Sequence, residues 1–395
     1  MTPLEHLPAL TALLRQCPAV TGKAGKAGSA ATLASVPLPV DEDGWEQFIA
    51  LANAQGVGPL VASALLAPAA PTLPAAVNRL RAIQAAATQK ALLQFGELLR
   101  VQARLQAEGI PMLFFKGQML AQQAYGSISL RTCFDLDIFV HQAAVLRVKP
   151  LLAALGYRPE FAFLPHQEAD LLRMECEYTF IREDGLARID LQWQPRARHF
   201  SFPIAPEALW ARSQRVRLQG FEVDTFALDD LVLLLVAHGA KHTWNRLEQV
   251  CALAALTHRN PALNWPDIQR SAREAGAERM LFVAVNLVCS HFQAPVPEAL
   301  RTRAASDAVA TALAAEFADR WWLPYQPQPL SATVRRHLRM RERVSDRLRY
   351  CFWLAVTPTP QDWLEHPFPP GLHWAHYLLR PWRLACKSAR GERTT

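Results

Sequence analysis

Residues 111–140 read PMLFFKGQMLAQQAYGSISLRTCFDLDIFV, and the spacing of the apolar residues changes more than once within them. The segment begins with a short continuous apolar run, which is typical of a buried strand. The pair Lys116-Gly117 follows it and opens a short helix, MLAQQAY, and an irregular loop then leads to DLDIFV. The alternation of apolar and polar residues in DLDIFV indicates a second strand. The segment therefore predicts part of a small sheet with a helix beside it.

Two pairs of short strands are expected after this segment. ECEYTFIR and LARIDLQW flank EDG, a favourable hairpin turn, and RVRLQGFEVDTF contains a second candidate hairpin. A helix is expected to start near Asp229, and from there to the C-terminus the chain is mainly helical, with prolines between the helices. The sum predicts an α+β fold in which a small mixed sheet is set between helical flanks.

Four regions are expected along the chain. Residues 1–40 hold a short helix and a Gly/Ala/Ser-rich connector, TGKAGKAGSAATLASVPLP, whose composition is typical of flexible linkers. Residues 41–108 carry apolar residues at three- and four-residue steps, which is the period of amphipathic helices. Residues 109–227 should form the sheet-containing core, and residues 228–395 a C-terminal helical region.

Length and composition limit the class of protein. The chain has 395 residues, 51% of them hydrophobic, which is enough for one large core or roughly two to three smaller ones. Its longest apolar run, Leu231 to Ala237, is too short for a bilayer, which needs roughly 20 apolar residues. The N-terminus lacks the basic region of a secretory signal. We therefore expect a cytoplasmic protein with no membrane span.

Cysteine and charge content exclude some sites and favour others. Seven cysteines are widely spread with no CxxC pair, so a disulfide framework or a zinc ribbon is not expected. The net charge of +7 suits polyanionic ligands, either triphosphates or nucleic acid. The arginine-rich residues 333–350 are expected on one helix. That helix would contact nucleic acid or, in the interpretation we favour, be solvated and laced with Glu342 and Asp346.

Three carboxylates are the candidate catalytic residues. Asp135 and Asp137 stand two positions apart, so they point to the same face of a strand with Cβ atoms roughly 6–7 Å apart. This spacing suits one hard cation or a pair of bridged ions. Asp190 lies on the far strand of the first hairpin, which could pair alongside and add a third carboxylate. Because such acids repel one another unless neutralised, the pattern predicts a Mg²⁺ site; the alternative is aspartates that cap strands or face solvent.

Cationic groups near these acids suggest an anionic ligand. Lys116 and Gly117 open a helix after a strand, so backbone N–H groups and an ammonium point where phosphates could sit. Arg131, in the loop before the Asp-x-Asp pair, suits a phosphoryl oxygen.

A second group of polar residues lies in HGAKHTWNRL, on or just past an apolar helix. His238 and His242 have the i, i+4 spacing that can hold zinc, but no glutamate follows the first histidine and no third ligand is evident nearby. We expect these histidines to line a pocket for nucleotide or acceptor, with Lys241 and Arg246 facing anionic groups. Trp244 could stack on a base, but a packed core position is favoured.

The order of apolar strand, Lys-Gly, short helix, Arg and Asp-x-Asp in residues 111–140 resembles the uncharacterised nucleotidyltransferase family of the DNA polymerase β superfamily. It is also similar to the nucleotidyltransferase toxins of abortive-infection systems. The resemblance continues through IDLQW, LVLLLVAHGAKHTWNRL and HYLLRPWRL, and spans roughly Trp45 to Leu384. It implies a polymerase β-like nucleotidyltransferase core.

The resemblance further implies an enzyme that transfers a nucleoside monophosphate from a nucleoside triphosphate, ATP among the candidates, to a hydroxyl acceptor. Two ions, Mg²⁺ or Mn²⁺, would be bound by Asp135 and Asp137, with Asp190 holding the catalytic ion. The residues implied to handle the triphosphate are Lys116, Gly117 and Arg131. The acceptor remains open between a small molecule, a peptide, a protein and RNA.

Two positions depart from the family pattern. The usual Gly-Ser or Gly-Gly pair is Gly117-Gln118 here, and related sequences tend to carry an aspartate where this chain has Cys251. One alternative is therefore a catalytically degenerate protein that binds a nucleotide or a partner in a biosynthetic or defence system. Another is a phosphotransferase that uses the same site.

Overall fold

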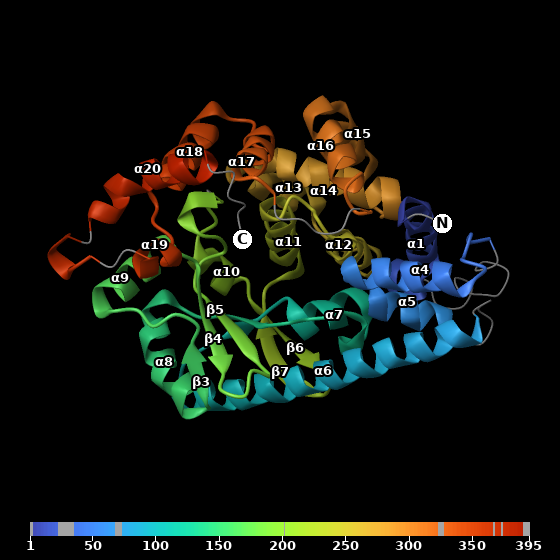
Figure 1. Cartoon of the computed structure of the whole chain (residues 1–395), viewed down its shortest axis with the longest axis horizontal. Helices are drawn as coiled ribbons and strands as arrows, with labels where there is room; N and C mark the ends of the chain where they lie inside the picture. Colours follow the sequence, from blue (N-terminus) through green and yellow to red (C-terminus); the bar gives the residue numbers. More distant parts are fainter. Residues whose placement is uncertain are drawn as a thin grey trace.

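The computed structural model describes residues 3–22, 35–67, 73–200, 202–322, 328–365, 368–372 and 374–389. Most of the expected connector, residues 23–34, lies outside the described residues. The helices outnumber the strands, and two small sheets lie among them (Figure 1). The α+β class predicted from the sequence is confirmed.

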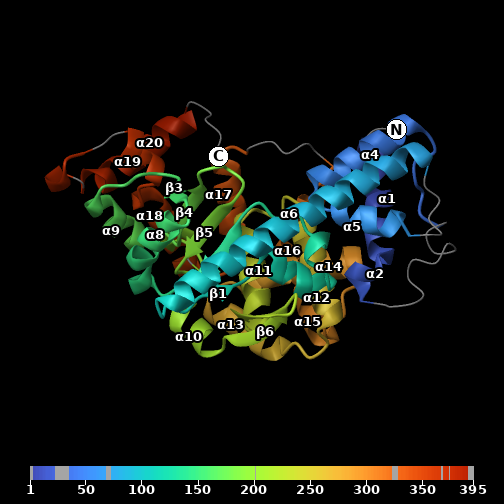
Figure 2. The ribbon, with the colours of Figure 1, turned by 90° about the horizontal axis from the view of Figure 1, so that it is seen from below.

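The first helices gather at one end of the molecule (Figure 1). They are α1 (Pro3–Gln16), α2 (Pro18–Thr21), α4 (Glu42–Ala54) and α5 (Gly58–Leu65). A long helix, α6 (Pro74–Ala107), then runs diagonally from these helices to the sheet (Figure 2). It starts with proline at its first position, where the missing N–H would have no partner within the helix.

The larger sheet has five strands in the order β1-β2-β5-β4-β3. The strands are β1 (Leu113–Phe114), β2 (Leu136–Phe139), β3 (Tyr157–Pro159), β4 (Glu177–Arg182) and β5 (Arg188–Gln192). Strand β2 pairs in parallel with β5, and the other neighbours are antiparallel. The first expected hairpin is β4–β5. The second hairpin, β6 (Gln214–Leu218) with β7 (Phe221–Thr225), forms a separate two-stranded sheet.

One face of the large sheet is apolar. Leu136, Ile138 and Leu191 belong to one core cluster with Leu98 of α6 and Val148 of α8 (Val145–Ala154). Because successive strand residues point to opposite faces, the neighbours of these apolar residues turn the other way. The polar residues on that second face are Asp137, Glu177, Thr179, Asp190 and Gln192.

Further short helices connect the strands. They are α7 (Gly117–Tyr125), α9 (Pro165–Met174) and α10 (Pro206–Ala211), with 3₁₀ turns η1 (Ile128–Leu130), η2 (Gln142–Ala144) and η3 (Arg198–Phe200). The C-terminal part is helical: α11 (Leu228–Lys241), α12 (Leu247–Arg259), α13 (Trp265–Glu274), α14 (Glu278–Phe292), α15 (Glu298–Ser306), α16 (Ala308–Ala318), α17 (Leu330–Arg339), α18 (Val344–Val356), α19 (Pro360–Glu365), η4 (Pro370–Leu372) and α20 (Ala375–Ala389). Within the described part of the chain, no helix combines the length and apolarity that crossing a membrane requires.

The arginine-rich segment differs from the single solvated helix that we expected. It forms two helices, α17 and α18, with a break between them. Arg336 and Arg339 both form ion pairs with Glu316. Arg341 is fully buried, with its guanidinium 4.2 Å from the ring centroid of Tyr350. The expectation is wrong because the break lets Arg341 enter the core, where aromatic rings and backbone carbonyls replace water around its charge.

Candidate active site

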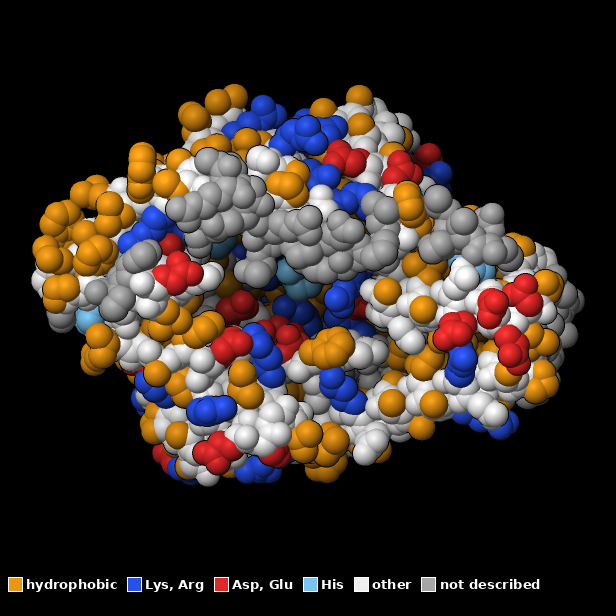
Figure 3. Space-filling view, in the orientation of Figure 1, with side chains coloured by type: hydrophobic (Ala, Val, Ile, Leu, Met, Phe, Trp, Pro, Cys, Tyr) orange, Lys and Arg blue, Asp and Glu red, His pale blue; other side chains and the backbone are white. Residues whose placement is uncertain are grey.

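A cavity of about 620 Å³ lies over the polar face of the large sheet. Its lining comes from α4 and the start of α5, the loop before β2, strands β2, β4 and β5, and helices α11 and α12. Figure 3 shows the middle of this face of the molecule hollowed, with acidic, basic and histidine side chains gathered in the hollow. The N-terminal helices, the sheet and the C-terminal helices thus all contribute to one site.

The three predicted carboxylates line this cavity together. Parallel pairing of β2 and β5 places Asp137 directly opposite Asp190. Asp135 lies one residue before the start of β2. Side chains of directly opposed residues stand on the same sheet face. The strand register therefore places Asp137 and Asp190 on one face, and Asp135 joins them in the cavity from the loop just before β2.

Asp137 already has two polar partners. The Lys116 ammonium lies 2.7 Å from Asp137 Oδ1, and the two side chains are only 9% and 6% exposed. Gln192 Nε2 donates to the same oxygen at 2.9 Å. Lys116 has φ of 41°, a left-handed backbone conformation that is uncommon outside glycine. The chain makes this turn between β1 and α7, where Lys116 reaches the polar face of the sheet.

Asp190 is held by its neighbours on the sheet. Thr179, its cross-strand partner, donates from Oγ1 to Asp190 Oδ1 at 2.8 Å, and Arg188 Nε lies 3.5 Å from that oxygen. Burial raises the pKa of Asp190 to about 7, and the carboxylates of Glu177, Asp135 and Asp137 add to the effect. Burial, followed by the charge of Asp137, also raises the pKa of Asp135. Burial is thus the main cause of both shifts, and mutual repulsion of the carboxylates adds to it.

Glu177 is a fourth carboxylate in the cavity, and our sequence reasoning missed it. It lies opposite Gln192 in the β4–β5 hairpin, and Gln192 Nε2 donates to Glu177 Oε2 at 3.2 Å. The position of Glu177 in the expected hairpin could have revealed it. Once the hairpin sets Thr179 against Asp190, residue 177 must lie two positions along the same face.

Arg131 lines the cavity but is already paired. Its Nε lies 2.5 Å from Oε1 of Glu248, and its Nη1 donates to the sulfur of Cys133 at 3.3 Å. Glu248, in the first turn of α12, was also missed by our sequence reasoning. The pair ties the loop before β2 to α12, so part of the Arg131 guanidinium is already committed to holding this loop.

His238 and His242 line the cavity from the end of α11 and just after it. Their ring centroids are 4.6 Å apart. Burial first, and then nearby lysine and arginine charges, lowers the pKa of both rings well below the usual range, so both are neutral at physiological pH. Lys241 and Arg246 also line the cavity. The four polar residues that we singled out in this segment therefore line one cavity.

Trp244 lies in the core, as we favoured from the sequence. Its side chain is fully buried. A Cβ at Gly239 would lie within 2.6 Å of the Trp244 ring, so only glycine leaves room for the indole there. Trp244 does not line the cavity.

The two departures from the family pattern lie away from the cavity lining. Gln118 is buried in α7 and donates to Gln94 at 2.5 Å, and Gln94 donates in turn to the backbone oxygen of Cys133. Cys251 is buried in the core of α12. Gly117 also does not line the cavity. A Cβ at Gly117 would lie 3.3 Å from the Phe114 ring, and its φ of 45° favours glycine, so this residue serves the turn into α7.

The donor atoms of this cluster fit a hard divalent cation in their chemistry. Carboxylate oxygens are the ligands that Mg²⁺ takes in proteins, and repulsion between carboxylates adds to the effect of burial in raising the pKa of Asp135 and Asp190. In the present arrangement Asp137 faces Lys116. Across the described ranges, no three His, Cys, Asp or Glu side chains are grouped so that they could already hold a metal ion. A cation would therefore have to draw the carboxylates together and compete with Lys116.

Comparison with known proteins gives one family. A family model described as an uncharacterised nucleotidyltransferase matches residues 41–293. No curated protein matches the sequence. Among solved structures, the chain is similar to an antigenic nucleotidyltransferase-like protein from Paracoccidioides brasiliensis, with 13% sequence identity and a TM-score of 0.31. That match covers 55% of this chain and 96% of the other, and its TM-score is too low to indicate a shared fold.

Proposed function

This chain belongs to the uncharacterised nucleotidyltransferase family, and we propose that it transfers a nucleoside monophosphate from a nucleoside triphosphate to a hydroxyl acceptor, with divalent cations as cofactors. Its enzyme class, nucleotidyltransferase, follows from the family. The metal dependence and the residues of the site are our proposals. Their main support is the register of β2 and β5, which opposes Asp137 and Asp190 inside the cavity.

Asp135, Asp137 and Asp190 are the proposed ligands of two Mg²⁺ or Mn²⁺ ions. Such ions, when bound, would neutralise phosphate charge and make the acceptor hydroxyl easier to deprotonate. Glu177 adds a fourth carboxylate within hydrogen-bond reach of Gln192. Gln192 bonds both Glu177 and Asp137, so it fixes the position of one proposed ligand relative to its acidic neighbour.

The charge of the cavity suits a metal–triphosphate complex. Its lining holds five acidic and five basic side chains: Asp135, Asp137, Glu177, Asp190 and Glu248 against Lys116, Arg131, Arg196, Lys241 and Arg246. A triphosphate alone would meet the carboxylates, and cations alone would meet the lysines and arginines. A triphosphate with divalent cations is nearly neutral, so the balanced lining favours the two bound together.

The remaining residues of the proposed site are three cations, two neutral histidines and one glycine. Lys116, Lys241 and Arg246 are proposed to face the phosphates, because each brings a cation to the cavity lining. His238 and His242 are neutral, so their role would be to hydrogen-bond the nucleoside or the acceptor. Gly117 is proposed to act through the turn that positions Lys116.

The degenerate alternative rested on Gln118 and Cys251. Both lie away from the cavity lining, so neither removes a group from the proposed site. The full set of carboxylates instead favours turnover, because buried acids with no task would only cost stability.

The test is to supply the full-length protein with Mg²⁺, mixed triphosphates labelled at the α-phosphate, and a cell extract. Transfer of label to a product together with release of pyrophosphate is the expected result. In a parallel reaction with triphosphates labelled at the γ-phosphate, transfer of that label to a product would mean phosphoryl transfer instead. Replacing both Asp135 and Asp137 by asparagine should abolish the transfer in a folded protein. An exposed aspartate on the β4–β5 turn provides the matched control, Asp184→Asn.

A further inference from the structure

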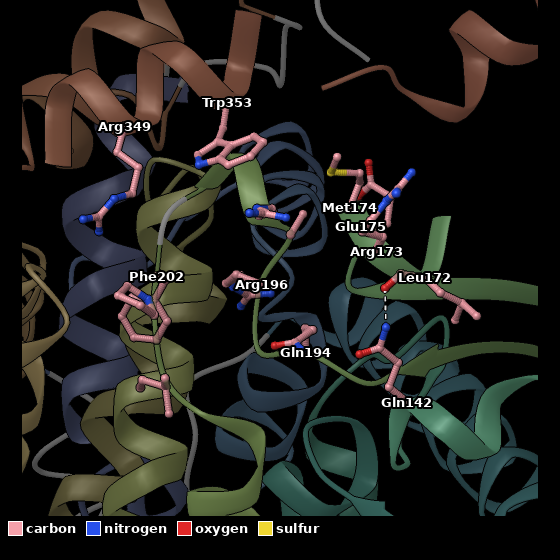
Figure 4. Close-up of a pocket in the computed structure, with 14 residues that line it drawn as sticks. Gln142, Leu172, Arg173, Met174, Glu175, Gln194, Arg196, Phe202, Arg349 and Trp353 are labelled. Carbon is pink, nitrogen blue, oxygen red and sulfur yellow. Dashed lines mark hydrogen bonds between the residues drawn. The ribbon is translucent and has the colours of Figure 1, made fainter. Parts of the chain in front are cut away.

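A second cavity, of about 790 Å³, adjoins the first. One residue, Arg196, lines both. Figure 4 shows Arg196 near the middle of the second cavity, with Phe202 and Arg349 on one side and Met174 and Glu175 on the other. This volume lies within the range of about 300–1,000 Å³ that is usual for small-molecule sites.

Arg196 is a buried cation with no direct ion-pair partner among the described residues, although the carboxylates of Glu177 and Asp137 attract it from a longer distance. It is 7% exposed, and its Nη2 donates to the backbone oxygen of Leu234 at 3.3 Å. Its Nε has no hydrogen-bond partner, and no ion pair to it is found among the described residues. Burying a charge without a direct partner destabilises a protein, so a bound anion that pairs with Arg196 would be favoured. An arginine fork is suited to a phosphate or a carboxylate.

The rest of the second cavity combines positive charge with apolar surface. The guanidinium of Arg198 lies 4.0 Å from the ring centroid of Trp353. Nη1 of Arg349 lies 3.4 Å from Oδ1 of Asp346. Burial, and then the charge of Glu177, raises the pKa of Glu175 to about 7, so this carboxyl carries only part of a negative charge near pH 7. The apolar part of the lining includes Leu172, Met174, Phe202 and Ile204. A ligand with an anionic group on an apolar or planar body matches this lining.

We propose that the second cavity binds the acceptor, a small molecule that carries a phosphate or carboxylate group on an apolar or planar body, and that Arg196 contacts this anionic group. This inference rests on the proposed nucleotidyl transfer in the first cavity.

The chain itself connects the two sites. Asp190 and Gln192 line the first cavity, Gln194 lines the second, and Arg196 lines both. These are alternate residues of β5 and of the segment that follows it, so a short stretch of chain leads from a proposed metal ligand to the proposed anion contact. From Asp190 to Arg196 the chain spans at most about 20 Å. In this proposal, an acceptor whose anionic group contacts Arg196 places its hydroxyl in the first cavity and most of its body in the second.

The experiment measures binding of three probes to the full-length protein by calorimetry. The probes are phenyl phosphate, benzoate and the neutral benzyl alcohol, each with Mg²⁺ and a saturating, non-hydrolysable triphosphate analogue. At least one anionic probe should bind at least tenfold more tightly than benzyl alcohol while the analogue stays bound. Comparing phenyl phosphate with benzoate tells which anionic group the cavity prefers.

Variants then locate the probe. Arg196→Ala should lower the affinity for the anionic probe at least tenfold. Arg198→Ala and Trp353→Ala, which change only the second cavity, should also weaken it while the affinity for the triphosphate analogue stays the same. Arg335→Ala changes an exposed arginine that lines neither cavity, and it should have no effect on either ligand.

Three results would overturn the inference in distinguishable ways. Displacement of the anionic probe by the triphosphate analogue would assign Arg196 to the triphosphate in the first cavity. Tight binding of the analogue with no binding of either anionic probe would remove the acceptor site and leave the proposed function standing. A wild-type protein that binds no triphosphate analogue would remove the proposed function, and the acceptor assignment with it.

Discussion

The ammonium of Lys116 lies 2.7 Å from Oδ1 of Asp137, and both side chains are buried. Lys116 was expected to contact phosphate, and Asp137 was expected to bind metal. In the structure the two residues instead form an ion pair with each other. A divalent cation would compete with Lys116 for Asp137, and displacement would free the ammonium for a phosphate oxygen. The ion pair is thus compatible with both proposed roles, but the two residues would have to separate when the ligands bind.

Lys116→Met should make the protein's stability depend on metal. Removing one partner of a buried ion pair leaves the other charge unpaired and costs roughly 3–5 kcal/mol. Mg²⁺ should recover part of this loss, because it replaces the missing positive charge beside Asp137. Urea unfolding with and without Mg²⁺ measures both effects. The matched control is Lys149→Met, which breaks the pair with Glu168 outside the cavity and should show no Mg²⁺ response. Identical metal responses in the two variants would argue against a cation at Asp137.

The ion pair of Arg131 with Glu248 should stabilise the fold and contribute little to triphosphate binding. Glu248→Gln weakens the tie between the loop before β2 and α12, so the free energy of unfolding should fall by roughly 1–3 kcal/mol. Triphosphate affinity should change by less than about threefold, or 0.7 kcal/mol. Arg131→Met should behave in the same way if Arg131 acts through Glu248. A far larger loss of triphosphate affinity in Arg131→Met than in Glu248→Gln would show a direct phosphate contact.

Much of the site followed from local rules of the sequence. The β4–β5 hairpin that carries Asp190 and the place of Asp137 on a neighbouring short strand followed from turn and strand patterns. The parallel pairing of β2 with β5 is long-range, and Asp135 lies just before β2. Glu177 could have been found from the same hairpin pattern. The pairing of Arg131 with Glu248 could not, because these residues are 117 positions apart and meet only when α12 packs beside the loop. The burial of Arg196 could not be predicted for a related reason, because the local sequence does not distinguish a buried arginine from an exposed one.

In the metal-free protein, Asp190 should contribute a loss of stability as pH rises from about 4 to about 7. The pKa of Asp190 is about 7 in the folded chain against 3.8 ordinarily, so the folded state binds more protons in that window and unfolding becomes easier as they leave. The slope contributed by this residue is at most about 1.4 kcal/mol per pH unit. Glu175 contributes in the same direction. Five histidines whose pKa is lowered by burial contribute in the opposite direction below the ordinary histidine pKa: His199, His238, His242, His291 and His337.

The contribution of Asp190 is isolated by comparing wild type with Asp190→Asn. As pH rises from about 4 to about 7, the free energy of unfolding of the wild type should fall relative to that of Asp190→Asn. Saturating Mg²⁺ should reduce this relative loss. Unfolding in urea at several pH values measures it. Parallel pH profiles for the two proteins would mean that the carboxyl of Asp190 titrates in its ordinary range.

Asp190 should also separate turnover from binding. Its proposed partner is the catalytic ion, whereas Asp135 and Asp137 would also hold the ion that accompanies the triphosphate. Asp190→Asn should therefore cut turnover by orders of magnitude and leave Mg²⁺-triphosphate affinity within about tenfold, or 1.4 kcal/mol. The structural alternative is that Asp190 only accepts bonds from Thr179 and Arg188. Arg188→Met is the control, because it removes the arginine and keeps the carboxylate, so it should retain turnover. Normal turnover in a folded Asp190→Asn protein would rule out the three-carboxylate site, since a proposed ligand of the catalytic ion would have been removed without consequence.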